Sequence, residues 1–150
     1  MENRVPPPVI LLLTLLLMYG VAAIDTLTSF NFGYANYLAA IFVAAGSLVI
    51  FLGVIQFIRA QTTVDPLKPS RASKLVTTGV FRFTRNPMYL GMALICIGAA
   101  WRFESVLAAL GVALFIVFIQ RYQIKPEERA MRALFAKEFD AYCKTTSRWI

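Results

Sequence analysis

A short run of basic, aromatic and amide side chains at residues 82–91 carries the clearest potential for chemistry in this sequence. Asn86 is a good N-cap, because its side chain can accept a hydrogen bond from a free backbone N–H one turn into a helix. Pro87 then falls at the first helical position, where its missing N–H costs nothing. The pattern predicts a helix that begins here, with its positive dipole end beside Arg82 and Arg85. Such an end can hold an anionic group.

A pair of carboxylates follows the last long apolar stretch. Glu127 and Glu128 come directly after Pro126, which either starts a new helix, with both glutamates in its first turn, or kinks the preceding one. At about 100° per residue the helix carries one apolar stripe, with Glu128 about 30° and Glu127 about 70° from its centre. The stripe consists of Met131, Phe135, Phe139 and Tyr142. We therefore expect Glu128 to face a pocket and Glu127 to hold Arg82 or Arg85.

Both groups also have a simpler interpretation. The first is then an ordinary capped membrane helix with basic anchors, and the glutamates only complement a helix dipole and form salt bridges. The sequence contains no histidine, which excludes histidine-based triads and histidine-ligated metals or haem. Cys96 and Cys143 are far apart and suggest neither a disulfide framework nor a zinc site.

The elements that must position these groups are membrane helices. The chain is 59% hydrophobic with a mean hydropathy of +0.66. Residues 5–24 and 26–58 are uncharged over 20 and 33 residues, and residues 86–101 and 105–120 over 16 each; about 20 apolar residues cross a bilayer. We expect an all-α, polytopic single domain over residues 1–150. Its expected spans are 9–23, 36–58, 87–101 and 105–122, with the first one retained and not a cleaved signal.

Charge placement predicts the orientation. One basic residue precedes the first span, six lie at 59–87 and seven follow the last span, with only Arg102 on the other side. The positive-inside rule then places both termini, the loop 60–86 and an amphipathic tail at 124–150 in the cytoplasm. We expect the inner membrane of a prokaryote. The net charge of +7 fits anionic membrane lipid as a partner better than nucleic acid.

The central loop is longer than a compact connector needs, which hints at a lid or a binding loop. Pro66 and Pro69 forbid a continuous helix there.

Residues 85–91, Arg-Asn-Pro-Met-Tyr-Leu-Gly, resemble the Arg-His-Pro-x-Tyr-x-Gly signature of integral-membrane methyltransferases. These are the isoprenylcysteine carboxyl methyltransferases and the phospholipid (phosphatidylethanolamine N-) methyltransferases. The glutamate pair resembles the family's second motif, and Tyr142 with Arg148-Trp149-Ile150 resembles its C-terminal tail. The resemblance covers roughly residues 60–150. Asn86 replaces the usual histidine and cannot titrate, which supports a binding role over proton transfer.

The resemblance implies S-adenosylmethionine as cofactor, held in a helical cleft, since no Rossmann fingerprint is present. It implies catalytic roles for Arg85 and Glu128. It implies cofactor contacts from Asn86, Pro87, Tyr89, Leu90, Gly91, Glu127 and Glu128. It implies substrate contacts from Arg82, Arg129, Arg148 and Trp149. A lipophilic acceptor is expected to enter from the bilayer, and the oligomeric state stays open.

Methyl transfer is an in-line displacement, so alignment and desolvation can supply most of the catalysis. An ionised carboxylate or thiolate acceptor needs no base, whereas an amine must lose a proton. An isoprenylcysteine-like carboxylate is therefore favoured, with a phospholipid amine and a small thiol left open. A non-enzymatic membrane protein is the alternative of another class. It is either a catalytically silent relative or a carrier, although a carrier should place an acid within a span and only Asp25 comes close.

Overall fold

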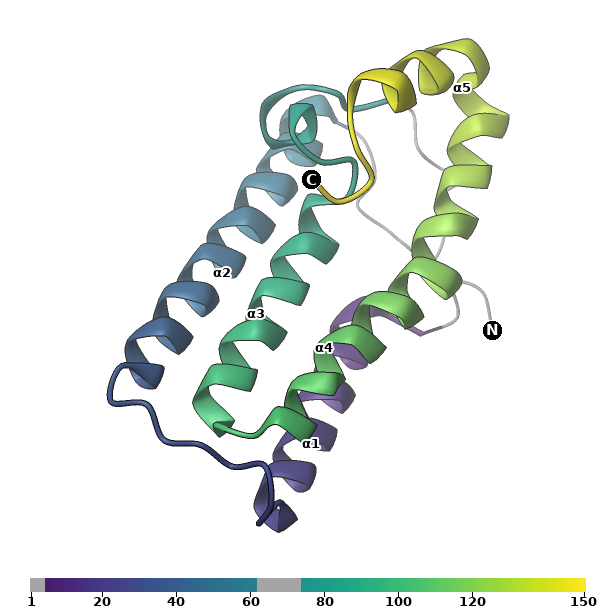
Figure 1. Ribbon diagram of the computed structural model, residues 1–150. Helices are drawn as coiled ribbons and strands as arrows, with labels where there is room; N and C mark the ends of the chain where they lie inside the picture. The colour runs from purple at the N-terminus through teal and green to yellow at the C-terminus, as the bar shows by residue number, and fades with distance from the viewer. Residues whose placement is uncertain (1–4, 62–73) are drawn as a thin grey trace.

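The computed structural model describes residues 5–61 and 74–150, and in this part of the chain it is helical, with one isolated bridge between Ser29 and Ser105 (Figure 1). The α-helices of these described residues are α1 (Pro7–Ile24), α2 (Ala35–Ala60), α3 (Pro87–Phe103), α4 (Val106–Ile119) and α5 (Lys125–Thr145). The predicted all-α fold is therefore confirmed. Residues 62–73, part of the predicted loop 60–86 with its proposed lid role, lie outside the described residues.

Within residues 5–61 and 74–150, three helices are long and apolar enough to cross a membrane. They are α1, α2 and the continuous helix Val106–Thr145, while α3 is a shorter apolar helix of 17 residues. Their outer faces carry large exposed apolar side chains, such as Leu13 at 59% and Val117 at 64%. Apolar surface of this extent suits lipid and not water. The predicted membrane architecture is thus supported, and the fourth span stays a prediction.

Small residues bring α2 and α3 together, side by side in Figure 1. A Cβ atom on Gly91 would lie 2.5 Å from the carbonyl oxygen of Gly46, and one on Gly46 would lie 2.5 Å from the carbonyl oxygen of Gly91. A Cβ atom on Gly98 would likewise lie 2.9 Å from the carbonyl oxygen of Ala39. Close backbone approach at small residues is a common way for membrane helices to associate. This contact fixes the start of α3, and with it the segment before α3.

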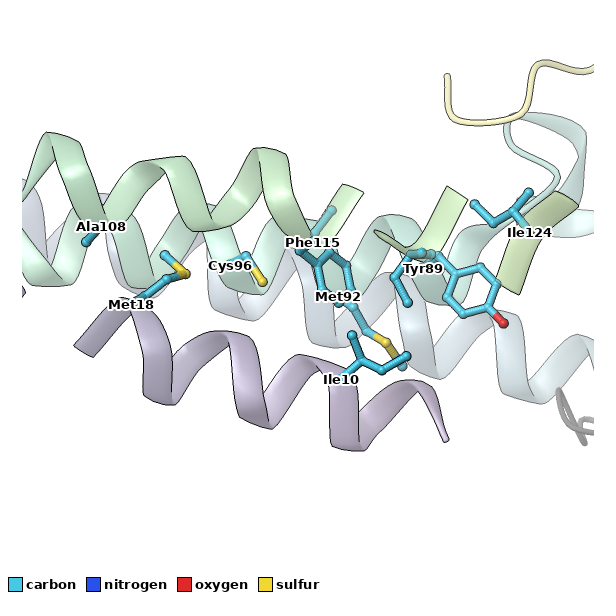
Figure 2. Close-up of a cluster of buried hydrophobic side chains, with 10 residues drawn as sticks. Ile10, Met18, Tyr89, Met92, Cys96, Ala108, Phe115 and Ile124 are labelled. Atoms are coloured by element: carbon cyan, nitrogen blue, oxygen red, sulfur yellow. The ribbon is translucent and has the colours of Figure 1, made fainter. Parts of the chain in front are cut away.

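A second core joins α1, α3 and α4. Figure 2 shows Ile10 and Met18 of α1 packed against Met92 and Cys96 of α3 and Phe115 of α4. Tyr89 and Ile124 close this row of buried side chains at one end (Figure 2). The core therefore holds the first turns of α3 against the region where α4 leads into α5.

The α4–α5 junction differs from the prediction of a span that stops near residue 122. The chain continues from α4 through one π-helical turn, η3 (Gln120–Ile124), directly into α5, and Pro126 lies in the first turn of α5. Pro126 lacks the N–H that an α-helical ladder would use, which suits a helix start at this point. Gln123 of η3 donates from Nε2 to the carbonyl of Val5 at 2.8 Å. The start of α1 is therefore bound to this junction.

Helix α5 carries the predicted apolar stripe. Phe139 and Tyr142 are buried, and Met131 and Phe135 pack partly buried against the same cluster. The cluster also includes Phe81 of the 3-10 turn η2 (Gly79–Arg82). The helix bends at Ala136, whose φ of 38° is not helical. The stripe thus packs the C-terminal half of α5 against the segment before α3.

Candidate functional site

Arg85, Glu128 and Arg148 form an ion cluster where the start of α3 meets the start of α5. Arg85 Nη2 lies 2.9 Å from Glu128 Oε1. Arg148 binds the same carboxylate through Nε, 3.0 Å from Oε1, and through Nη2, 2.6 Å from Oε2. Only 13% of the Glu128 side chain and 11% of the Arg85 side chain are exposed. The pair is therefore shielded from water, where charge-assisted bonds gain strength.

The Glu128 carboxylate is ionised in this setting. Burial opposes its ionisation, but the hydrogen bonds and charges of Arg148 and Arg85 outweigh burial and hold the Glu128 pKa below its usual value. Two guanidinium groups thus share one carboxylate, and the cluster keeps a net positive charge. Arg85 also donates to the carbonyl oxygens of Cys143, at 3.4 Å, and of Thr146.

Two groups beside the cluster, one buried and one half-buried, lack the partner that their chemistry requires. Arg85 Nε is buried and has no hydrogen-bond acceptor among the described residues. Glu127 Oε1 accepts a hydrogen bond from the Tyr89 hydroxyl, but within residues 5–61 and 74–150 it forms no ion pair. A buried donor without an acceptor and a half-buried carboxylate without a cation both cost free energy. Together they suit a ligand that carries an anion and a cation.

Glu127 lies just beyond the apolar part of α4–α5 and is strongly affected by burial. Burial raises the pKa of Glu127 to about 8, the hydrogen bond from Tyr89 acts against this rise, and the charge of Glu128 adds to it. Neighbouring glutamates therefore differ in protonation: Glu128 is a paired carboxylate, and Glu127 titrates near neutral pH. Pairs of this kind are a common property of functional sites.

The segment of residues 146–150, here called the tail segment, also borders the site. It folds back from α5 to the start of α3 (Figure 1). Asn86 donates from Nδ2 to the carbonyl of Arg148 at 2.9 Å, and the Thr84 hydroxyl donates to the same oxygen at 3.3 Å. The backbone N–H of Arg85 donates to the carbonyl of Ser147 at 3.0 Å. The segment before α3 and the tail segment thus form one hydrogen-bonded unit.

The helix start at Pro87 is as predicted, but the capping role of Asn86 was wrong. Asn86 occupies the N-cap position without a side-chain bond to the first turn of α3. Its amide instead donates to the tail segment, because a backbone carbonyl of a distant residue lies within reach. The sequence pattern could not anticipate this partner, which lies 62 residues further along the chain.

The remaining predicted residues lie around this cluster. Pro87 is buried at the start of α3, and Leu90 is half-buried one turn in. Trp149 is half-buried and donates from Nε1 to Gln120 Oε1 at 3.0 Å. Arg82 and Arg129 are exposed at the rim, and the Arg82 carbonyl accepts from the Thr146 hydroxyl at 3.4 Å.

Gly91 is the predicted cofactor residue whose surroundings differ most from the expectation. It faces Gly46 and Ile50 of α2, where an added Cβ atom would collide with both. A bulky side chain at position 91 would therefore separate two helices before it could block a pocket. The structure assigns Gly91 to helix packing.

Comparison with known proteins identifies the family of this chain. A family model described as phospholipid methyltransferase matches residues 34–138, which include the start of α3 and both glutamates. The chain belongs to this family. Among curated proteins, it is 25% identical over 114 residues to a protein of Oryza sativa subsp. indica named "Probable protein-S-isoprenylcysteine O-methyltransferase", and equally to the protein of that name from subsp. japonica.

The aligned region covers 76% of this chain and 60% of each rice protein, so the chain spans about three fifths of these relatives. A third relative, an uncharacterized protein of Haemophilus influenzae, is 35% identical over 63 residues, which cover 42% of this chain and 100% of that protein. No solved structure matches.

In this methyltransferase family member, the structure corrects one role expected for the two glutamates. Glu128, and not Glu127, holds Arg85, while Glu127 bonds to Tyr89. Sequence reasoning also missed the polar side chains that bind the tail segment and the junction: Thr84, Thr146, Gln120 and Gln123. The two glutamines close an otherwise apolar run, which is a place where a polar side chain needs a specific partner.

Proposed function

We propose that this protein transfers a methyl group from S-adenosylmethionine to a lipophilic acceptor at the membrane surface. The observation that carries the proposal is the meeting of both family motifs in one cluster, with Arg85 Nη2 2.9 Å from Glu128 Oε1. The motifs lie 43 residues apart in the sequence, and α3 and α5 bring their first turns together. Family membership supports methyl-transfer chemistry at this place.

The residues present fit a zwitterionic, cationic cofactor. Among the described residues, Glu127 offers a half-buried carboxylate without a cationic partner, and Arg85 Nε offers a buried donor without an acceptor. We infer that Glu127 receives the ammonium or sulfonium charge of the cofactor, and Arg85 its carboxylate. When bound, S-adenosylmethionine supplies an electrophilic methyl group. The protein's own part is to hold both partners in line and to exclude water.

The acceptor we favour is an isoprenylcysteine-like carboxylate. Two rice relatives carry that activity in their names. The Arg85–Glu128–Arg148 cluster keeps a net positive charge, which favours an anionic acceptor group over a cationic one. An ionised carboxylate also needs no base.

A phospholipid amine is the second candidate, and one observation favours it. The Glu127 pKa of about 8 suits a group that takes a proton from an amine near neutral pH. The name of the matching family points the same way.

The decisive experiment uses detergent-purified protein. Titration calorimetry with S-adenosylmethionine tests cofactor binding, and we expect a saturable heat. Transfer of a radiolabelled methyl group is then measured to N-acetyl-S-farnesylcysteine, to phosphatidylethanolamine vesicles and to a small thiol. Labelling of the farnesylcysteine supports the favoured acceptor, and labelling of the phospholipid supports the second. Cofactor binding without transfer to any of the three would reject these acceptors, and absence of cofactor binding would reject the methyltransferase assignment.

A further inference from the structure

The tail segment is held more firmly than a passive end of a chain requires. Its backbone carbonyls accept bonds from Arg85, Asn86 and Thr84, and its Arg148 side chain binds Glu128. The Trp149 indole N–H donates a hydrogen bond to Gln120 Oε1 of η3. The segment is therefore bound from three elements at once: the residues before α3, the first turn of α5, and η3.

Asn86 is the side chain that joins this segment to the start of α3 most directly. It is buried, with 9% of its surface exposed, and its amide nitrogen lies 2.9 Å from the Arg148 carbonyl oxygen. Thr84, 2% exposed, donates to the same oxygen and accepts from the Asn86 backbone N–H at 3.1 Å. Two buried donors thus converge on one carbonyl. This contact requires a hydrogen-bond donor at position 86 and no titrating group.

We propose that Asn86 is a positioning residue whose task is to dock the tail segment and so complete the methyl-transfer site. Through the Arg148 backbone it places the Arg148 guanidinium on Glu128, which leaves Glu127 as the carboxylate open to a ligand cation. The proposal rests on the proposed function. The role suits a residue that cannot titrate, since an amide N–H donates to a carbonyl as an imidazole N–H also would.

Tail docking can be measured without any cofactor. The chain has two tryptophans, so a Trp101→Phe background leaves Trp149 as the single tryptophan, whose fluorescence is excited selectively at wavelengths that tyrosine does not absorb. Acrylamide quenching of Trp149 then reports how well the tail segment is docked. Asn86→Asp keeps the size but loses the donor and repels the Arg148 carbonyl, and Asn86→Leu loses the polar group altogether. We expect quenching in both variants to rise toward that of free tryptophan amide, while Asn86→His stays close to the parent protein.

Calorimetry and turnover then separate positioning from chemistry. We expect Asn86→Asp and Asn86→Leu to weaken S-adenosylmethionine binding by about tenfold or more, as for the loss of a buried hydrogen bond, and Asn86→His to restore it. Turnover of Asn86→His should show the same pH profile as the parent between about pH 6 and about pH 8. Circular dichroism and size-exclusion chromatography confirm that each variant is folded.

Two results would overturn the proposal. One is a Trp149 as shielded in folded Asn86→Asp and Asn86→Leu as in the parent protein. The other is an Asn86→His variant that gains turnover with a new pH-dependent limb, because position 86 would then take part in proton transfer. If the parent protein fails to bind S-adenosylmethionine while quenching still depends on residue 86, the proposed function falls and the docking role stands.

Discussion

Glu127 and Glu128 are neighbours with opposite electrostatic environments. Glu128 is surrounded by guanidinium groups, whereas Glu127 meets a phenol and an apolar core. Environment, and not residue type, therefore decides which of them is a permanent anion at neutral pH. Two predictions rest on Glu127, which forms no ion pair with another described residue.

The first concerns cofactor affinity. Glu127→Gln keeps the size of the side chain and removes its charge, so it should weaken S-adenosylmethionine binding about ten- to a hundredfold, as for a lost charge-assisted bond. Calorimetry in detergent measures this change. Tyr89→Phe is the matched control, because it removes the hydroxyl donor but keeps the carboxylate, and its loss should be smaller. Undiminished affinity of the Glu127→Gln variant would show that Glu127 does not bind the cationic group of the cofactor.

The second concerns the stability of the ligand-free protein. The folded-state pKa of Glu127, about 8, lies above its ordinary value of 4.5, so between these values the folded state binds more protons than the unfolded state. Stability contributed by this group is then present at low pH and lost as pH rises toward 8. We expect the thermal midpoint to fall between about pH 5.5 and about pH 8.5, and to fall less in Glu127→Gln. Parallel curves for the two proteins would contradict a raised pKa.

At the scale of elements, the sequence predicted more of the fold than of the site. Uncharged apolar runs and the Pro87 start signal located the helices, because bilayer thickness and backbone chemistry act locally along the chain. The sequence did not predict the hydrogen bond from Asn86 to the Arg148 carbonyl or the ion pairs of Glu128. Both depend on how the tail segment packs against the start of α3. A π-helical turn leaves no signature in hydrophobic periodicity, so η3 was also missed, although Pro126 left a continued helix open.

The contact between α2 and α3 gives a prediction at this scale. Gly46→Leu and Gly91→Leu should each lower the thermal midpoint of the purified protein substantially, because each side chain would meet backbone atoms of the facing helix. Gly20→Leu is the control, since an added Cβ atom there meets nothing within 4 Å. If Gly91→Leu and Gly20→Leu have equal thermal midpoints and only Gly91→Leu loses cofactor binding, Gly91 lines the cofactor pocket as the sequence predicted.

For the whole molecule, the start of α1 and the tail segment lie at one end of the helix bundle. Gln123 bonds to Val5, and Gln120 to Trp149, so one π-helical turn binds both regions. The loop at residues 25–34 lies at the opposite end, where Asp25 Oδ2 accepts from the Ser105 hydroxyl at 2.5 Å. The structure thus sets which segments share a side, and basic residues predict that this side is cytoplasmic.

Cysteine labelling tests that orientation. In a Cys96→Ala, Cys143→Ser background, Gly33→Cys marks the loop and Lys137→Cys marks α5, and both positions are exposed. We expect a membrane-impermeant maleimide to label Gly33→Cys in intact cells and Lys137→Cys only in inside-out vesicles. Labelling of Lys137→Cys from outside intact cells would invert the topology.

The partners of Arg85 also set an order of events in biosynthesis. The carbonyl groups that receive its guanidinium belong to residues 58 and 61 positions later, and the carboxylate that pairs with it lies 43 positions later. A ribosome therefore delivers the arginine well before any of these groups. While α4 and α5 are still being made, Arg85 remains hydrated at the membrane surface. The site closes only when the tail segment emerges, which makes its assembly a late step that follows helix insertion.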